Sequence, residues 1–413
     1  MKQGMKKQLV LSATVGGIFL FAPVVLAAEE QNAPTVEEVT GSNQVSSETS
    51  TLSEVATSQG IPTVTASSSE NTATGQTSET RLLAMTDDQA SQETKELYAY
   101  LKDLNKKKDI LFGQQHALDE GVTLTSEGSR AGSTDSDVKN AVGDYPAVFG
   151  WDTLSLDGYE KPGVSGDPKQ SIANLTHSMK TAHQLGGIIT MSTHPHNFVT
   201  GGDFNDTSGN VVQEILPGGS KNNQFNQWLD RIAELAHNLK TDEGKTIPVI
   251  FRPFHEQTGS WFWWGESTTN PEQYKALYRY TVEYLRDQKG VHNFLYAYSP
   301  GAGNDRYFKT YPGDAYVDVL GIDSYDDKNQ PGSDSYIQAL KKDTTMLVKE
   351  AEARNKIAAL TEFGYSAQGL KNTGNTLDWY TRIFNALQKD PAASKIAYMM
   401  TWANFGMGNN LYT

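Results

Sequence analysis

The feature that most constrains the fold is an alternation of short apolar runs with longer helical patterns between residues 110 and 402. An apolar run without polar alternation is typical of a strand buried on both faces of a parallel sheet. Eight such runs separated by crossovers predict a (β/α)8 barrel in a single domain, with an open doubly wound sheet as the alternative. The alternative is weakened because no glycine-rich phosphate loop follows an early strand, which also argues against a phosphate cofactor. The predicted strands are Ile110–Gln114, Ala147–Trp151, Gly187–Ser192, Ile247–Pro253, Asn293–Tyr298, Val317–Ile322, Ile357–Thr361 and Ile396–Trp402.

The helical pattern that begins at Pro271 has the clearest signature. Asn270 is a cap residue, proline suits the first turn, and apolar side chains recur on one face. Thr413 follows the eighth predicted strand closely, so the sequence predicts a barrel without its last helix, as in a truncated chain. The predicted helices are Thr86–Lys106, Ser171–Leu185, Asn223–Lys240, Pro271–Gln288, Tyr336–Ala353 and Thr376–Gln388.

The N-terminal segment is typical of an exported bacterial protein. Residues 1–27 combine three lysines, an apolar run and a small-residue cleavage site, which predicts a signal peptide. A membrane anchor is the weaker alternative because polar residues, glycines and Pro23 interrupt the run. Residues 28–81 are rich in Ser, Thr and Glu and predict a disordered acidic linker. We therefore expect a secreted or cell-surface protein whose catalytic domain spans 82–413.

Charge and cysteine content exclude several classes of function. The chain has 35 Lys and Arg against 49 Asp and Glu, a formal net charge of -14, which makes nucleic acid and anionic membranes poor partners. A neutral polysaccharide is compatible with this charge. The absence of cysteine excludes thiol catalysis and thiolate metal sites. We expect a monomer that does not associate with a membrane once the signal peptide is removed.

Two carboxylates each follow or end a strongly apolar run: Glu256, after VIFRPFH, and Glu362, in IAALTEFG. Glycoside hydrolysis requires one protonated and one ionised carboxyl group. We expect Glu256 to be the acid, with its pKa raised by the neighbouring indoles, and Glu362 to be the nucleophile, held ionised by Tyr325 or another donor. The alternatives are an ion pair between Glu256 and Arg252, and a structural capping or pairing role for Glu362.

Histidines and serines suggest other chemistries less strongly. His194, His196 and His255 could ligate a metal, but there is no HExxH motif or histidine cluster on a helix, so no metal and no cofactor is expected. Ser192 and Ser260 lack the pattern of a nucleophile elbow.

Aromatic residues at strand ends suit a sugar pocket. Trp151 and Trp402 could stack on pyranose rings or fill the core, and the residues alone leave both open. In the WFWWG segment, Trp261 is expected to face substrate, while Phe262, Trp263 and Trp264 pack behind it.

Together, RPFHE, WFWWG, GIDSY, TEFG and the final TW resemble glycoside hydrolase family 26, whose best known members are endo-β-1,4-mannanases. The resemblance covers residues 110–402 and implies a (β/α)8 barrel with the general acid/base after strand 4 and the nucleophile at the end of strand 7. The roles that it implies are Glu256 as acid/base, Glu362 as nucleophile, His255 as a residue that positions Glu256, Tyr325 as a donor to Glu362, and His194, Arg252, Trp261, Asp323 and Trp402 around the substrate.

One position departs from the family pattern: Thr193 stands where a tryptophan often precedes the histidine, so one aromatic contact is expected to be missing. The resulting hypothesis is a secreted retaining endo-β-glycanase that hydrolyses β-1,4-mannosidic bonds by double displacement. Alternatives are a β-1,3-xylanase or mixed-linkage β-glucanase of the same family, a carbohydrate-binding barrel without turnover, and a metal-dependent esterase or deacetylase.

Overall fold

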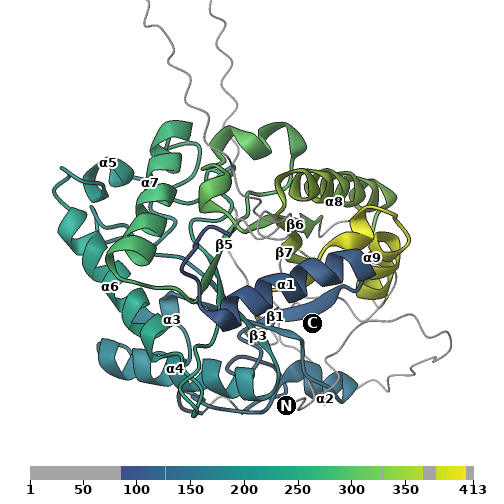
Figure 1. Cartoon of the computed structure of the whole chain (residues 1–413), viewed down its shortest axis with the longest axis horizontal. Coiled ribbons are helices and arrows are strands. Elements are labelled where there is room, and N and C mark those ends of the chain that lie inside the picture. The colour runs from purple at the N-terminus through teal and green to yellow at the C-terminus, as the bar shows by residue number, and fades with distance from the viewer. Residues whose placement is uncertain (1–84, 126, 328–329, 366–377, 406–413) are drawn as a thin grey trace, which may run out of the picture. The chain divides into compact units, whose positions relative to one another are not determined.

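Eight parallel strands form a closed barrel in sequence order, with β8 beside β1 (Figure 1). The computed structural model describes residues 85–125, 127–327, 330–365 and 378–405. The closed barrel confirms the predicted (β/α)8 architecture and excludes the open sheet. The strands are β1 (Leu111–Gln115), β2 (Val148–Asp152), β3 (Ile188–Ser192), β4 (Val249–Arg252), β5 (Phe294–Tyr298), β6 (Val319–Asp326), β7 (Ile357–Tyr365) and β8 (Tyr398–Thr401).

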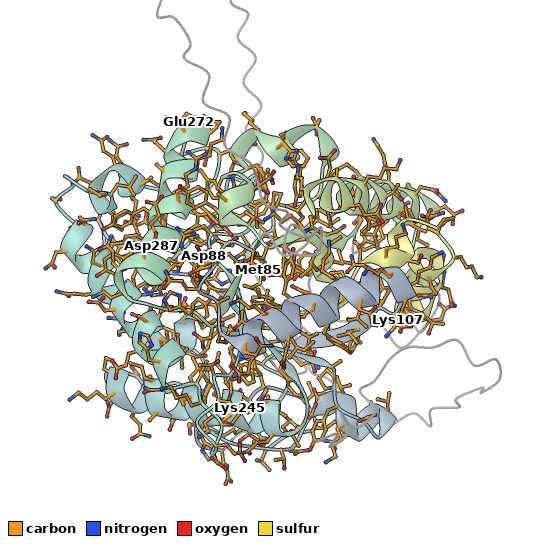
Figure 2. The ribbon with its side chains drawn as sticks, in the orientation of Figure 1. Met85, Asp88, Lys107, Lys245, Glu272 and Asp287 are labelled. Atoms are coloured by element: carbon orange, nitrogen blue, oxygen red, sulfur yellow. The ribbon has the colours of Figure 1, made fainter. Side chains whose placement is uncertain are left out.

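Helices surround the barrel in the connections between strands (Figure 1). Charged side chains such as Lys107 and Glu272 lie at the periphery (Figure 2), and their side chains are 61% and 79% exposed. Among the described residues, no helix combines the length and apolarity needed to span a bilayer. The α-helices are α1 (Gln92–Lys107), α2 (Asp137–Val142), α3 (Leu154–Asp157), α4 (Pro168–Gln184), α5 (Val211–Ile215), α6 (Asn222–Asn238), α7 (Pro271–Glu283), α8 (Asp334–Arg354) and α9 (Trp379–Gln388).

Helix α7 begins as predicted. The Asn270 side chain accepts hydrogen bonds from the backbone N–H groups of Glu272 and Gln273, and the Gln273 side chain accepts one from the Asn270 backbone. This reciprocal cap explains why the helix starts at Pro271. After Glu283 the chain continues as a π-helical turn over Tyr284–Gln288, which completes the predicted segment.

Helix α1 covers the N-terminal end of the barrel (Figure 1). Its buried Tyr98, Leu101 and Leu104 share one apolar cluster with inward-facing residues of all eight strands, including Leu111 and Val148 at the starts of β1 and β2. The helix starts later than predicted, at Gln92, because the Ser91 hydroxyl accepts from the Thr94 N–H and caps it. With this end closed, the C-terminal end of the barrel remains for a binding site.

Several expectations lie outside the described residues. These are the signal peptide at 1–27, the linker at 28–81, the start of the final predicted helix at 376, and the absence of a helix after β8, since residues 406–413 are not described. The described part of that final predicted helix is α9.

Candidate active site

Strand β4 delivers Glu256 through a strained turn. Phe254 and Glu256 both adopt left-handed backbone conformations, with φ of 51° and 54°. The Phe254 N–H donates to Thr193 Oγ1 at 3.1 Å, and the Glu256 N–H donates to the Ser299 carbonyl at 2.9 Å. Left-handed backbone is costly for residues with a Cβ and persists where neighbours hold it in place. Thr193, which departs from the family pattern, is therefore a buried anchor of this turn.

Strand β7 delivers Glu362 through a β-bulge. Its register with β6 pairs Leu360 with Ile322 and then Glu362 with Asp323, so Thr361 is the extra residue. The Thr361 hydroxyl donates to the Ile322 carbonyl at 3.0 Å or to Asp323 Oδ1 at 2.7 Å. Bulges re-aim side chains where pairing is interrupted, and here the bulge sets Glu362 beside Asp323.

A buried arginine joins these two strands. Arg252, the last residue of β4, donates to Asp323 Oδ2 at 2.9 Å, to Glu362 Oε1 and to the Ser299 hydroxyl at 3.1 Å. Its side chain is only 1% exposed. Direct substrate contact, expected from the motif, does not fit this position; Arg252 instead neutralises and orients two carboxylates. The suggested ion pair with Glu256 is replaced by these contacts.

The carboxylate of Glu362 has a second donor. The Tyr325 hydroxyl donates to Glu362 Oε2 at 2.6 Å, so each carboxylate oxygen receives a hydrogen bond. The two donors come from different strands, Arg252 from β4 and Tyr325 from β6, and together they fix the orientation of the carboxylate. This is the contact expected of Tyr325, and it aims the Glu362 carboxylate into the cleft.

Three carboxylates converge at the centre. One oxygen each from Glu256, Asp323 and Glu362 lies within 4.8 Å of the other two. Burial, followed by the charge of Glu362, raises the pKa of Glu256 to about 7, while burial raises the pKa of Asp323 despite Arg252. Three such oxygens could hold a cation, but the Arg252 guanidinium already supplies positive charge to Asp323 and Glu362. The arrangement suits one protonated and one ionised carboxyl group.

Trp261 is the exposed member of the aromatic segment. The residue is 49% exposed, whereas Phe262, Trp263 and Trp264 are buried, as expected. Trp261 Nε1 donates to Glu256 Oε2 at 3.0 Å, and this bond lowers the pKa of Glu256. Burial raises the pKa of Glu256, as expected from its apolar surroundings, and the Trp261 hydrogen bond partly opposes this rise.

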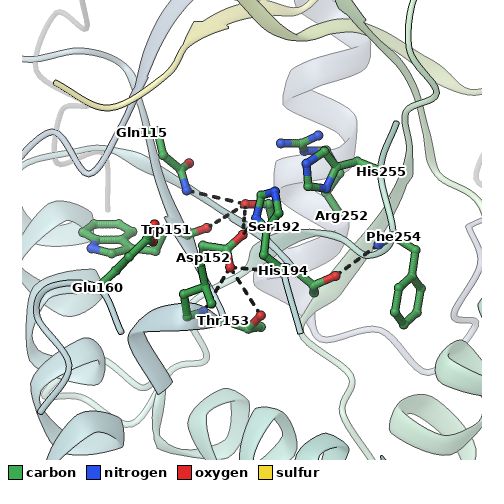
Figure 3. Close-up of polar contacts among 12 residues, drawn as sticks. Gln115, Trp151, Asp152, Thr153, Glu160, Ser192, His194, Arg252, Phe254 and His255 are labelled. Atoms are coloured by element: carbon green, nitrogen blue, oxygen red, sulfur yellow. Dashed lines mark hydrogen bonds and ion pairs between the residues drawn. The ribbon is translucent and has the colours of Figure 1, made fainter. Parts of the chain in front are cut away.

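His194 is held rigidly at the end of β3 (Figure 3). Asp152 Oδ2 lies 2.8 Å from His194 Nδ1 and accepts from the Ser192 hydroxyl at 2.5 Å, while Asp152 Oδ1 accepts from the His194 N–H at 3.1 Å. Burial lowers the pKa of His194, but the Asp152 charge and hydrogen bond outweigh it and raise the pKa overall. The ring is thus fixed in the cleft wall, and Asp152 stabilises its charged form.

His255 has the opposite electrostatics. Burial, Arg252 and His194 together lower the pKa of His255 well below its usual value, so the ring is neutral. Its Nε2 lies 3.7 Å from Glu362 Oε1, and its ring packs edge-on against His194 with centroids 4.5 Å apart. His255 was expected to position Glu256. Among the described residues, the carboxylate that its ring nitrogen approaches is that of Glu362 instead.

A cleft of about 670 Å³ lies at this end of the barrel. Trp402 lines it, whereas Trp151 is fully buried and donates from Nε1 to Asp119 at 2.5 Å, so the core interpretation of Trp151 holds. The predicted site residues that line the cleft are His194, His255, Glu256, Trp261, Asp323, Tyr325, Glu362 and Trp402.

The pattern of the whole domain is that of a known family. Residues 86–402 match the family model described as "Glycosyl hydrolase family 26". The chain belongs to glycosyl hydrolase family 26.

Relatives within family 26 include solved structures. The catalytic domain of an endo-β-1,4-mannanase from Bacillus sp. JAMB-750 is 59% identical, with a TM-score of 0.77, over 79% of this chain and 85% of that one. A modular endo-β-1,4-mannanase from Cellulomonas fimi is 46% identical, with a TM-score of 0.75, over 79% and 72%.

A curated relative is longer. A mannan endo-1,4-β-mannosidase from Bifidobacterium adolescentis is 45% identical over 334 residues, which are 79% of this chain and 32% of that protein. The chain therefore matches about a third of the length of this relative.

Some residues of this family 26 cleft escaped prediction. Most of them lie in loops, which no apolar run and no motif marks. Glu160 is the clearest: it follows α3, yet its carboxylate lies 2.9 Å from the ring of His116 at the end of β1. Ser324 also lines the cleft and lies in the GIDSY motif, but it was not predicted as a site residue. The other lining residues that were not predicted are Leu154, Phe204, Thr258, Gly259, Gly301, Ala302, Arg306 and Phe405.

Proposed function

We propose that this protein is a retaining endo-β-1,4-mannanase. One observation carries the mechanism: an oxygen of Glu256 and an oxygen of Glu362 lie within 4.8 Å of each other in a cleft of about 670 Å³. Retaining glycosidases place their carboxyl groups about 5–5.5 Å apart, whereas inverting enzymes need about 6.5–9.5 Å to admit a water molecule. The spacing supports direct attack by one of the two carboxylates.

Hydrogen bonding and charge assign the two roles. Glu256, with its pKa raised to about 7, is protonated near neutral pH and donates its proton to the departing glycosidic oxygen. Glu362, bound by Arg252 and Tyr325, attacks the anomeric carbon as that bond breaks and forms a glycosyl-enzyme. Ionised Glu256 then takes a proton from water, which attacks the same carbon and releases Glu362.

Mannan is the proposed polysaccharide because the relatives named above carry that activity in their names. Trp261 and Trp402 supply aromatic surface at the cleft for pyranose rings, and His194 supplies a fixed donor for a hydroxyl group. A neutral chain of sugars also suits a protein of net charge -14.

Two variants test the assignment on mannan, xylan and mixed-linkage glucan. Glu362→Ala should abolish release of reducing ends while the far-UV spectrum stays unchanged. Glu256→Ala should lose far more activity on mannan than on an aryl mannoside with an activated leaving group, since only the natural leaving group needs the acid. Preference of the wild type for xylan or mixed-linkage glucan would contradict the mannan assignment, and binding without product would contradict catalysis.

Export follows from the N-terminal sequence. We propose cleavage after residue 27, a linker over 28–81 and a catalytic domain over 82–413. Mass spectrometry of protein recovered from the medium of an expressing bacterium should find a chain that starts at residue 28. Retention of the intact N-terminus in the cells would contradict this proposal.

A further inference from the structure

Tyr159 is an exposed aromatic residue that the catalytic mechanism does not use. The residue is 61% exposed, and among the described residues only Val142 and Trp261 join it as large exposed hydrophobic residues. Trp261 lines the cleft, and Tyr159 directly precedes Glu160, which also lines it. Tyr159 and Trp261 therefore both lie beside the cleft, which suggests that they share a function.

Ring contacts connect Tyr159 to the cleft. Tyr159 stacks on His196 with centroids 4.1 Å apart and an angle of 17° between the rings. His196 is followed by Phe204 at 6.5 Å, and Phe204 by His194 at 4.9 Å. Phe204 and His194 line the cleft. These rings form a continuous aromatic track from the cleft wall to Tyr159 at the surface.

The loop that carries Tyr159 is fixed by hydrogen bonds on its inner side. The Ser155 hydroxyl donates to the Lys161 carbonyl at 2.8 Å, the Asn174 amide donates to the Pro162 carbonyl at 2.9 Å, and Glu160 pairs with His116. Because the loop is already held in place, little conformational entropy is lost when a ligand binds to it.

The segment beneath Tyr159 is fixed in the same way. Trp263 Nε1 donates to the Pro195 carbonyl at 2.8 Å, and the Asn197 N–H donates to the Gly202 carbonyl at 2.9 Å. His196 lies between these two anchors. One face of the Tyr159 ring is covered by His196, and the exposed area leaves the other face for a ligand.

We propose that Tyr159, backed by His196, is a sugar-binding platform outside the cleavage site, on which a distal residue of the same β-glycan chain stacks. The C–H face of a pyranose is apolar and slightly positive, which matches the negative face of an aromatic ring. Because the ring contacts lead from the cleft to Tyr159, the ligand expected there is the same glycan that binds in the cleft. This proposal rests on the proposed function and extends it to substrate length.

The test compares a long substrate with a short one. For Tyr159→Ala, the ratio of kcat/KM on mannohexaose to kcat/KM on mannotriose should fall roughly three- to tenfold, the scale of one lost ring contact. Tyr159→Phe should keep the ratio, because it keeps the ring. Tyr145→Ala removes a partly exposed ring that precedes β2, at the opposite end of the barrel, and should also keep it.

A second readout separates this proposal from catalysis. Calorimetric titration of mannohexaose into Glu362→Ala should show roughly three- to tenfold weaker binding when Tyr159→Ala is added. An unchanged affinity together with an unchanged length ratio would overturn the platform, as would an equal loss for Tyr159→Ala and Tyr145→Ala. Failure of the wild type to cleave mannohexaose would instead overturn the proposed function.

Discussion

Buried charge is the dominant feature of the site at the residue scale. A single guanidinium, Arg252, serves two carboxylates that come from different strands, Asp323 on β6 and Glu362 on β7. Removing one partner of a buried ion pair leaves an uncompensated charge, which costs much more than the pair itself contributes. Arg252 is thus required both for the fold of this end of the barrel and for the aim of Glu362.

Arg252→Met should lower the free energy of unfolding by about 3–5 kcal/mol, because Asp323 and Glu362 lose their buried counter-charge. Arg306→Met is the matched control: Arg306 lines the cleft, but its ion pair with Glu266 is 44% and 34% exposed, so its loss should cost about 0–1 kcal/mol. Urea denaturation measures both. Similar losses for the two variants would contradict the role given to Arg252.

The Trp261 indole tunes the acid. Activity requires protonated Glu256, so kcat/KM should be full below its pKa of about 7 and fall as the pH rises through that value. Trp261→Phe removes a hydrogen bond to the ionised carboxylate, which should raise the pKa and move the alkaline limb upward by about half to one pH unit. The pH profile of kcat/KM on mannohexaose, whose leaving group needs the acid, checks this. A downward shift would show that Trp261 does not stabilise the charged form.

At the element scale, the two ends of the barrel have separate tasks. Helix α1 fills the N-terminal end with apolar side chains, and the strand ends and bulge at the other end carry the polar groups. Stability and chemistry are therefore encoded in different residues of the same strands, as is usual in barrels of this type.

Leu101→Ala tests whether stability and catalysis depend on different residues. Leu101 is fully buried under the barrel, so the substitution should cost about 2–5 kcal/mol of stability, while kcat at temperatures where the protein stays folded should not change. Leu97→Ala, at a partly buried position on the same helix, should cost less. Thermal unfolding and initial rates on mannan give both quantities. A loss of kcat in the folded Leu101 variant would refute the separation.

Element types were predictable because apolar runs and caps are local features of the sequence. For example, Asn270 caps α7 and the apolar run before Glu256 forms β4, both as predicted. Strand ends were less predictable: β6 and β7 extend to Asp326 and Tyr365, beyond their apolar runs, because the two strands keep pairing past the bulge. A bulge depends on two strands at once, so no local pattern reveals it.

At the scale of the whole molecule, the closed barrel brings together carboxylates that are far apart in the sequence. Glu256 and Glu362 could be predicted from the apolar runs and motifs around them. The contacts of Arg252 and His255 with Glu362, and the contact of Glu160 with His116, could not. These contacts join side chains from different strands and loops. They depend on barrel closure and loop paths, which a single sequence does not specify.

The central claim is that Glu256 and Glu362 act by double displacement. Proton NMR of mannohexaose during the first minutes of hydrolysis tests it most directly, because it identifies the anomer released before mutarotation. Attack by Glu362 followed by attack of water inverts the anomeric carbon twice, so the β-anomer should appear first. Initial release of the α-anomer would mean a single displacement and would contradict the account.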